Sequence, residues 1–248
     1  MAKARTRLDV RLVELGLAES PVRAQAFIAA GVVKLGDRVV DKPGTLVPAD
    51  AQLVLKSRSP FVSRGGEKLA GALNALGIEV AGLRCADVGA STGGFTDCLL
   101  QRGAASVLAL DVGYGQLAAK LRGDPRVVVR ERTNVRSFAL GPDQPPYDLV
   151  TADVSFISLR RVLPSLIALA RPGGRLLLMV KPQFELERSA VERGGVVRDP
   201  ALRARAVREV REAAEALGLV ALGEADSVLA GPKGNREVFL LLGRPACA

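Results

Sequence analysis

Asp87-Val-Gly-Ala-Ser-Thr-Gly-Gly94 is the stretch of sequence that decides the fold of this chain. An apolar run with strand character precedes it, and a helical pattern begins directly after it at Phe95. Glycines in such a turn let the backbone bend sharply and approach a ligand without an intervening side chain. The stretch therefore predicts the strand–turn–helix unit of a nucleoside-binding α/β domain.

Strand-like apolar runs alternate with helical patterns on both sides of this turn. The seven predicted strands cover residues 85–89, 106–111, 126–130, 148–153, 175–181, 219–224 and 237–242, and the predicted helices cover residues 95–102, 116–122, 159–170 and 200–217. Alternation of this kind is typical of a parallel sheet with helices on both faces. We therefore expect a Rossmann-like seven-stranded α/β domain.

The first 60 residues predict a separate, small α+β domain. Leu8, Leu12 and Leu15 recur at helical spacing, and Ser20 is a favourable N-cap for a second helix. Three strands should follow, at residues 32–35 and 38–40, joined by Gly36-Asp37, and at residues 53–55. Ser57-Arg-Ser-Pro60 interrupts the pattern as a linker, which places domains at residues 1–60 and 61–248.

The chain is strongly basic. It has 35 Lys and Arg against 26 Asp and Glu, a net charge of +9 and a pI near 10.0. Such a surface favours a polyanionic partner, although it could serve solubility alone. Arg5, Arg7 and Arg11 at the start of the first helix, and Arg23 in the second, are candidates for RNA-backbone contacts; the alternative is a solvated helix face.

Other observations exclude several classes of protein. The chain contains no histidine, so a general base must be Lys, Asp, Glu or Tyr, and no metal site is expected. The charged amino terminus is not followed by an apolar stretch, and no segment has the ~20 apolar residues that span a bilayer. We expect a cytoplasmic protein with no stable membrane association.

The glycine-rich turn predicts a nucleoside cofactor without a pyrophosphate. Asp111 ends the next strand, 22 residues after Gly89, where a carboxylate can bind ribose hydroxyls. Ser91 replaces the middle glycine that close approach to a pyrophosphate requires, so S-adenosylmethionine fits better. The candidate cofactor residues are Asp87, Gly89, Ser91, Gly93, Asp111 and Asn134. The alternative is a turn that only packs a helix on the sheet.

Four charged residues should meet beside this turn. Asp153 and Lys181 end predicted strands, so both should lie at the carboxyl edge of the sheet, where such folds bind ligands. Glu237 begins the last strand and reaches the same edge if that strand runs antiparallel, while Lys68 lies in a helix before the first strand. Each residue alone could equally be a surface charge.

The order Lys68, Asp153, Lys181 and Glu237 around the turn resembles the Lys-Asp-Lys-Glu tetrad of FtsJ-type ribose 2'-O-methyltransferases. The strings Val-Ser-Arg-Gly-Gly-Glu-Lys68, Asp-Val-Gly-Ala-Ser-Thr-Gly-Gly-Phe-Thr-Asp97, Asp153-Val-Ser-Phe and Val-Lys181-Pro-Gln-Phe are similar to the TlyA family, also called hemolysin-type rRNA methyltransferases. This resemblance implies a small RNA-binding domain before a methyltransferase domain. It also implies methylation of a cytidine ribose 2'-hydroxyl in 16S rRNA, and in many members also in 23S rRNA, with ribosomal RNA or ribosomal subunits as partners.

The chemistry of these residues suits that reaction. A ribose hydroxyl must be aligned with the methyl group and lose a proton, and Lys181 is the candidate base within a coupled cluster. Lys68 could stabilise the developing oxyanion. Phe156 could stack on a flipped base or pack in the core, and Arg64, Arg132 and Arg136 are expected on loops that could bind RNA. The rivals are a membrane-lytic hemolysin and a non-catalytic RNA-binding factor.

Overall fold

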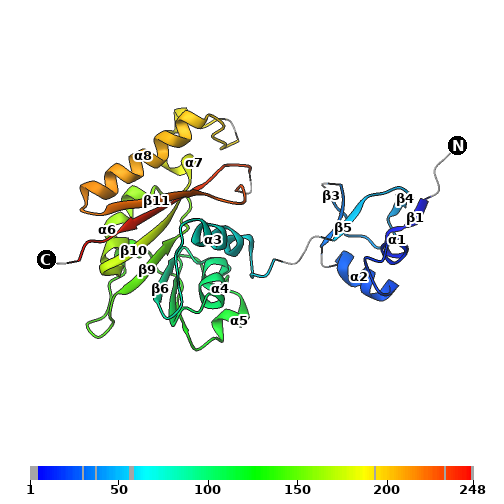
Figure 1. Ribbon diagram of the computed structural model, residues 1–248, viewed down its shortest axis with the longest axis horizontal. Coiled ribbons are helices and arrows are strands. Elements are labelled where there is room, and N and C mark those ends of the chain that lie inside the picture. The colour runs from blue at the N-terminus through cyan, green and yellow to red at the C-terminus, as the bar shows by residue number, and fades with distance from the viewer. Residues whose placement is uncertain are drawn as a thin grey trace. The chain divides into compact units, whose positions relative to one another are not determined.

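The chain forms two compact units. The structure is a computed structural model and describes residues 5–29, 31–36, 38–55, 59–192, 194–231 and 233–246. The units are Met1–Ser59 and Pro60–Ala248 (Figure 1). Asp37 of the predicted hairpin turn and Ser57 and Arg58 of the predicted linker lie outside the described residues.

The first unit combines two helices with short strands around a small apolar core. Its elements are β1 (Arg5–Arg7), α1 (Leu8–Glu14), α2 (Pro21–Ala29), β2 (Val33–Leu35), β3 (Arg38–Val39), β4 (Leu46–Pro48) and β5 (Leu53–Leu55). Sheet order is β3-β2-β5, with a separate antiparallel pair β1-β4. Leu8, Leu12, Ile28 and Val33 are fully buried in its core.

The predicted residues at the helix ends are confirmed, but the predicted position of two arginines is wrong. Ser20 Oγ accepts the Arg23 amide at 3.3 Å, and Gly16, just after α1, has a φ of +68°. Arg5 and Arg7 lie in β1 and not in the first helix. Their pairing with β4, Arg5 opposite Pro48, holds them extended, and only contacts distant in sequence create this strand.

The second unit is a seven-stranded sheet covered on both faces. The elements are α3 (Arg64–Ala75), β6 (Arg84–Val88), α4 (Gly94–Gln101), β7 (Ser106–Leu110), α5 (Ala119–Arg122), β8 (Val127–Arg130), η1 (Val135–Ser137), β9 (Tyr147–Ala152), η2 (Leu159–Arg161), α6 (Leu163–Leu169), β10 (Ala170–Val180), α7 (Pro182–Glu185), η3 (Arg188–Ala190), α8 (Pro200–Ala216), β11 (Val220–Asp226) and β12 (Val238–Gly243). The sheet order is β11-β12-β10-β9-β6-β7-β8, and β12 is antiparallel to both neighbours. The seven predicted strands and the antiparallel last strand are confirmed.

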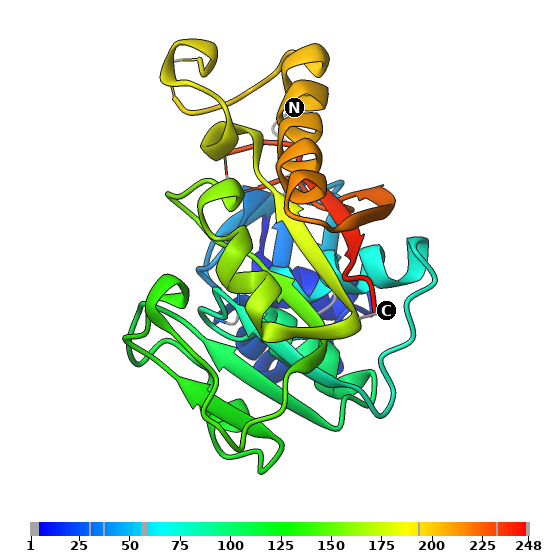
Figure 2. The same ribbon diagram turned by 90° about the vertical axis from the view of Figure 1, so that its left-hand side faces the viewer.

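Two apolar clusters hold the helices on the sheet (Figure 1, Figure 2). α6 and α8 pack on one face, and α3, α4 and α5 pack on the other. The helix predicted at residues 159–170 is divided into η2 and α6, because Pro164 at the start of α6 restricts the residue before it and cannot donate a helical hydrogen bond. The helix predicted from residue 116 begins only at Ala119.

The strand order places a binding crevice at the carboxyl ends of β6 and β9. From β6 the chain moves outward through β7 and β8, and it then returns to the other side of β6 with β9. The connections after β6 and β9 therefore leave the sheet on opposite faces and open a gap between them. The turn at residues 87–94 follows β6, and Asp153 follows β9 directly.

Candidate active site

The four charged residues from distant parts of the chain line one cavity of about 490 Å³. Lys68 comes from α3, Asp153 follows β9, Lys181 follows β10 and Glu237 precedes β12. Parallel strands β9 and β10 end at the same edge of the sheet, and antiparallel β12 begins at that edge. The topology therefore brings two ammonium groups and two carboxylates together.

These groups form two ion pairs. Lys181 Nζ lies 2.5 Å from Asp153 Oδ1, and Lys68 Nζ pairs with Glu237 Oε2. Lys68 and Glu237 are 7% and 3% exposed, so that pair is screened from bulk water, whereas Lys181 is 8% exposed and the Asp153 side chain is 25% exposed. A buried charge is tolerated when it is paired, because its partner replaces the lost solvation.

Ser155 is a site residue that the sequence-based prediction missed. Its Oγ accepts a hydrogen bond from Lys181 Nζ at 2.8 Å, and it lines the cavity with Asp153. The available signal was its position two residues after Asp153 at the end of β9. Lys181 Nζ is thus held between a carboxylate and a hydroxyl.

A second cavity, also of about 490 Å³, adjoins the first. The two share Gly89, Ser91, Asp153 and Ser155 as lining residues. The second cavity is otherwise mixed in character, with polar Asp111, Gln116, Thr133 and Asn134 and apolar Val88, Leu110, Val112, Val135, Ile157 and Val162. Apolar walls with a few polar groups are what a nucleoside cofactor requires.

Gly89 and Asp111 set the backbone between these cavities. Gly89 has a φ of +84°, and a Cβ there would lie 2.5 Å from the Asp153 carbonyl oxygen, so only glycine fits. The Asp111 carboxylate accepts the Ser91 amide at 2.7 Å and the Gly113 amide at 2.6 Å. Each carboxylate oxygen can accept a further hydrogen bond, so Asp111 retains capacity for ligand hydroxyls.

Asp87 and Gly93 line neither cavity, and their contact with a cofactor stays a prediction. Asp87 is fully buried and accepts the Thr96 amide at 2.9 Å and the Thr96 hydroxyl at 2.7 Å, which ties β6 to the first turn of α4. A Cβ on Gly93 would collide with Leu121 of α5. Both residues therefore hold the turn through its contacts with the helices α4 and α5.

Asp87 should make the stability of the fold depend on pH. Burial raises the pKa of Asp87 to about 7, and the nearby charge of Asp153 acts in the same direction. The folded state then holds a proton that the unfolded chain loses near pH 4, so the free energy of unfolding falls as pH rises from about 4 to 7.

In Asp87→Asn, this dependence should disappear, because the amide oxygen can still accept from Thr96 without ionising. The stability of the variant relative to the wild type should rise by roughly 2 kcal/mol between pH 5 and pH 7, since one pKa unit corresponds to about 1.4 kcal/mol. Urea unfolding at pH 5, 6, 7 and 8 measures the difference. Parallel pH curves for the two proteins would contradict this assignment.

Glu185 connects the segments that carry Asp153 and Lys181. It is the last residue of α7, the helix that begins directly after Lys181, and it is 4% exposed. Its carboxylate accepts the Ser158 hydroxyl at 2.5 Å and the Leu159 amide at 2.8 Å, both in the segment after Asp153. Burial raises the pKa of Glu185. These bonds therefore hold the segment after Lys181 against the segment after Asp153.

Phe156 is exposed beside the active site, so its predicted alternative of core packing is wrong. Its side chain is 91% exposed, and it has a φ of +65°. Its ring centre lies 5.3 Å from that of Phe184 in α7, a residue that the sequence-based prediction did not select. The exposed Phe156 ring beside the half-buried Phe184 offers a stacking surface.

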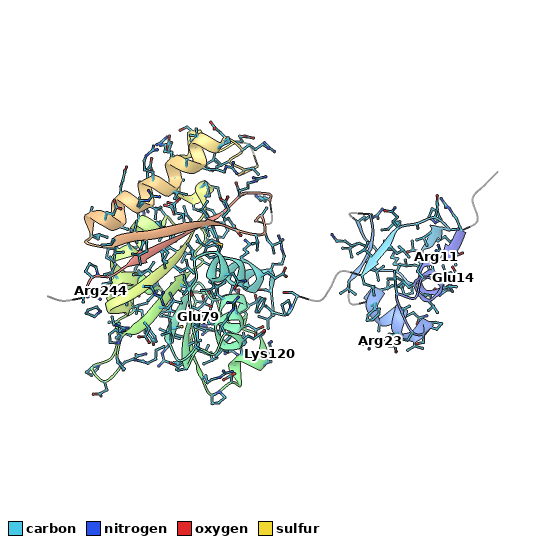
Figure 3. All side chains as sticks on the ribbon, in the orientation of Figure 1. Arg11, Glu14, Arg23, Glu79, Lys120 and Arg244 are labelled. Carbon is cyan, nitrogen blue, oxygen red and sulfur yellow. The ribbon has the colours of Figure 1, made fainter. Side chains whose placement is uncertain are left out.

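The candidate RNA-contacting arginines differ in how far they are already engaged. Arg64 is the first residue of α3 and Arg136 lies in η1, so neither is on a simple loop, whereas Arg132 stacks on Tyr114. In the first unit, Arg7 pairs with Asp9, Arg11 pairs with Glu14 at 3.0 Å (Figure 3), and Arg23 lies over the Phe27 ring. Arg5, Arg7 and Arg23 are exposed.

Known proteins share this combination of domains. Residues 61–244 match the FtsJ-like methyltransferase family, and residues 6–53 match the S4 domain. The Mycobacterium tuberculosis 16S/23S rRNA (cytidine-2'-O)-methyltransferase TlyA is 51% identical, covering 96% of this chain and 90% of that protein.

Two further relatives carry hemolysin names. Hemolysin A of Brachyspira hyodysenteriae is 39% identical, covering 93% of this chain and 97% of that protein. A solved structure of a "putative hemolysin" from Streptococcus thermophilus is similar with a TM-score of 0.76 and 36% identity, covering 98% of this chain and 90% of that one. With a matched family along most of its length and relatives along nearly all of it, the chain belongs to the TlyA family of FtsJ-like methyltransferases.

Proposed function

We propose that this protein transfers the methyl group of S-adenosylmethionine to the ribose 2'-hydroxyl of a cytidine in ribosomal RNA. The observation that carries the proposal is the cavity in which Lys68, Asp153, Lys181 and Glu237 meet, directly beside the second cavity. The name of the M. tuberculosis relative supplies the nucleotide and the RNA class. The S4 domain match supports RNA as substrate.

The second cavity suits S-adenosylmethionine. Asp111 would bind the ribose hydroxyls, Asn134 and the apolar walls would hold the base, and Gly89 and Ser91 would pass close to the methionine part. When bound, this cofactor supplies an electrophilic methyl group on a sulfonium. The shared lining of the two cavities would let an acceptor in the first cavity reach that group.

Lys181 would orient the target hydroxyl and accept its proton. A lysine accepts a proton only in its neutral form, and Asp153 at 2.5 Å would hold the ammonium that forms when Lys181 takes the proton of the hydroxyl. Ser155 would fix the position of Nζ, and Lys68, held by Glu237, would supply a second positive charge to the oxygen as it becomes negative. Because the four groups are close, the proton belongs to the cluster as a whole.

The structure offers no support for the two rival functions. No helix within the described residues combines the length and the apolar character needed to cross a membrane. A non-catalytic RNA-binding factor would not need the buried Lys68–Glu237 pair and the buried Lys181 ammonium beside a cofactor-sized cavity, because buried charges are costly to keep.

Phe156 should contribute to RNA binding and not to folding. We expect Phe156→Ala to raise the KM for RNA by about 5- to 150-fold, since stacking one base on an aromatic ring is worth about 1–3 kcal/mol. The melting temperature should stay unchanged, because the ring is 91% exposed; the affinity for S-adenosylmethionine is measured separately, because Phe156 also lines the second cavity. Phe156→Leu, which keeps apolar bulk without a ring face, should lose nearly as much. An unchanged KM in both variants would contradict stacking.

The function is tested by supplying radiolabelled S-adenosylmethionine with small and large ribosomal subunits that lack the modification. A methyl group on the 2'-oxygen blocks alkaline cleavage of the next phosphodiester, so labelled positions should be alkali-resistant cytidines. Label on a base, or on protein only, would refute the proposed reaction.

A further inference from the structure

A second concave surface of the methyltransferase unit lies between α8 and the strands β11 and β12. It encloses about 540 Å³ and shares no lining residue with either active-site cavity. Figure 1 shows α8 lying along β11 on this side of the sheet. Four arginines line it, Arg203, Arg208 and Arg211 of α8 and Arg236 of the segment before β12, and we call it the arginine groove.

The arginine groove holds positive charge that is not neutralised internally. Its carboxylates are Glu224 and Asp226; Glu224 pairs with Arg211, and Arg208 pairs with Glu212 one turn further along α8. Over the described parts of the chain, Arg203 and Arg236 form no ion pair or side-chain hydrogen bond. Arg211 Nε is buried and has no acceptor. A buried donor without a partner is rare in native proteins and calls for an external acceptor or a water molecule.

One end of the arginine groove reaches the catalytic edge of the sheet. Arg236 immediately precedes Glu237. The next residue, Val238, is paired with Val180 of β10 on one side and with Asp226 of β11 on the other. Lys181, which follows Val180, therefore lies at the same edge as Arg236. A polyanion that leaves the catalytic cavity past Glu237 would meet the arginine groove next.

We infer that the arginine groove binds the phosphodiester backbone of the RNA flanking the target nucleotide, an inference that rests on the proposed function. Guanidinium groups suit phosphate oxygens because they present several donors in one plane. Arg203 and Arg211 are eight positions apart, about 12 Å along a helix axis, so they could contact different phosphates of one strand. Such contacts position RNA without reading its sequence.

The test compares two double variants with equal loss of charge. Arg203→Gln/Arg236→Gln alters the arginine groove. Arg126→Gln/Arg171→Gln is the control, because these arginines lie at the start of β8 and β10, at the opposite edge, and pair with Asp124 and Asp148. Binding of ribosomal RNA is measured without cofactor at several salt concentrations, and kcat and KM are measured with cofactor.

The groove variant should lower the slope of log affinity against log salt by about 1.4–1.8, because each of its two lost phosphate contacts removes about 0.7–0.9. Its KM for RNA should rise at least about tenfold, with kcat within about twofold of the wild type. The control should change neither slope nor KM appreciably. Both variants should retain the wild-type melting temperature within a few degrees, since surface substitutions have small effects on stability.

Three results would overturn the inference. The slope could change equally in both variants, or it could stay unchanged in the groove variant. The groove substitutions could also weaken the binding of polyglutamate while leaving the binding of RNA unchanged. The proposed function fails separately. Wild-type protein that binds RNA with the expected slopes but transfers no methyl group to ribose would refute the reaction and leave the groove in place. Normal methylation with an unaffected groove variant would refute only the groove.

Discussion

Lys181→Ala is expected to lower kcat for RNA methylation by about 10²–10⁴-fold, the usual contribution of a positioned general base. The substitution removes the amine that contacts both Asp153 and Ser155. The affinity for S-adenosylmethionine, measured by calorimetry, should change by less than about threefold, because Lys181 lines the acceptor cavity and not the second cavity. Single-turnover transfer of labelled methyl groups measures the loss of rate.

Lys181→Arg separates a base from a fixed positive charge. Arginine can keep the ion pair with Asp153, but its guanidinium does not give up a proton in proteins. We therefore expect the Arg variant to be nearly as slow as the Ala variant, although more stable. A nearly wild-type rate in Lys181→Arg would show that Lys181 acts only through its charge, and equal labelling by wild type and Lys181→Ala would remove its catalytic role altogether.

Gly89→Ala should destabilise the fold and weaken cofactor binding at the same time. A side chain at the φ of +84° costs about 1–3 kcal/mol, and the new Cβ would also press on the Asp153 carbonyl oxygen at 2.5 Å. Relief of that contact moves β9 away from the turn, so we expect the affinity for S-adenosylmethionine to fall at least tenfold. Urea unfolding and calorimetry measure the two effects.

Gly218→Ala is a matched control for this prediction. Gly218 follows α8 and has a φ of +85°, yet no atom lies within 4 Å of a Cβ built there. It should show the backbone cost alone, about 1–2 kcal/mol, with unchanged cofactor affinity. If Gly89→Ala is no more destabilised than Gly218→Ala and binds the cofactor normally, the close approach of the turn to β9 matters neither for stability nor for cofactor binding.

Much of the second unit could be predicted because its signals are local. A buried parallel strand needs a continuous apolar run, and a strand-to-helix turn needs glycine, so the seven strands and the turn at residues 87–94 are apparent from neighbouring residues. The same holds for Ser20 and Gly16 at the helix ends of the first unit. Each of these features depends on a few consecutive residues.

The mistaken assignments involve contacts that local sequence does not record. Arg5 belongs to a strand only because β4, some 40 residues later, pairs with it. Phe156 could have packed in either environment, and only the course of the chain after β9 exposes it.

By itself, then, the sequence determined the α/β class, the strand positions and the set of residue types available for chemistry, because periodicity and turn geometry are short-range properties. Only the tertiary structure decided which charges meet. Lys68 and Glu237 are 169 positions apart, and their pairing depends on β12 running antiparallel beside β10. Strand order and direction are set by the packing of the whole sheet, which no short stretch of sequence specifies.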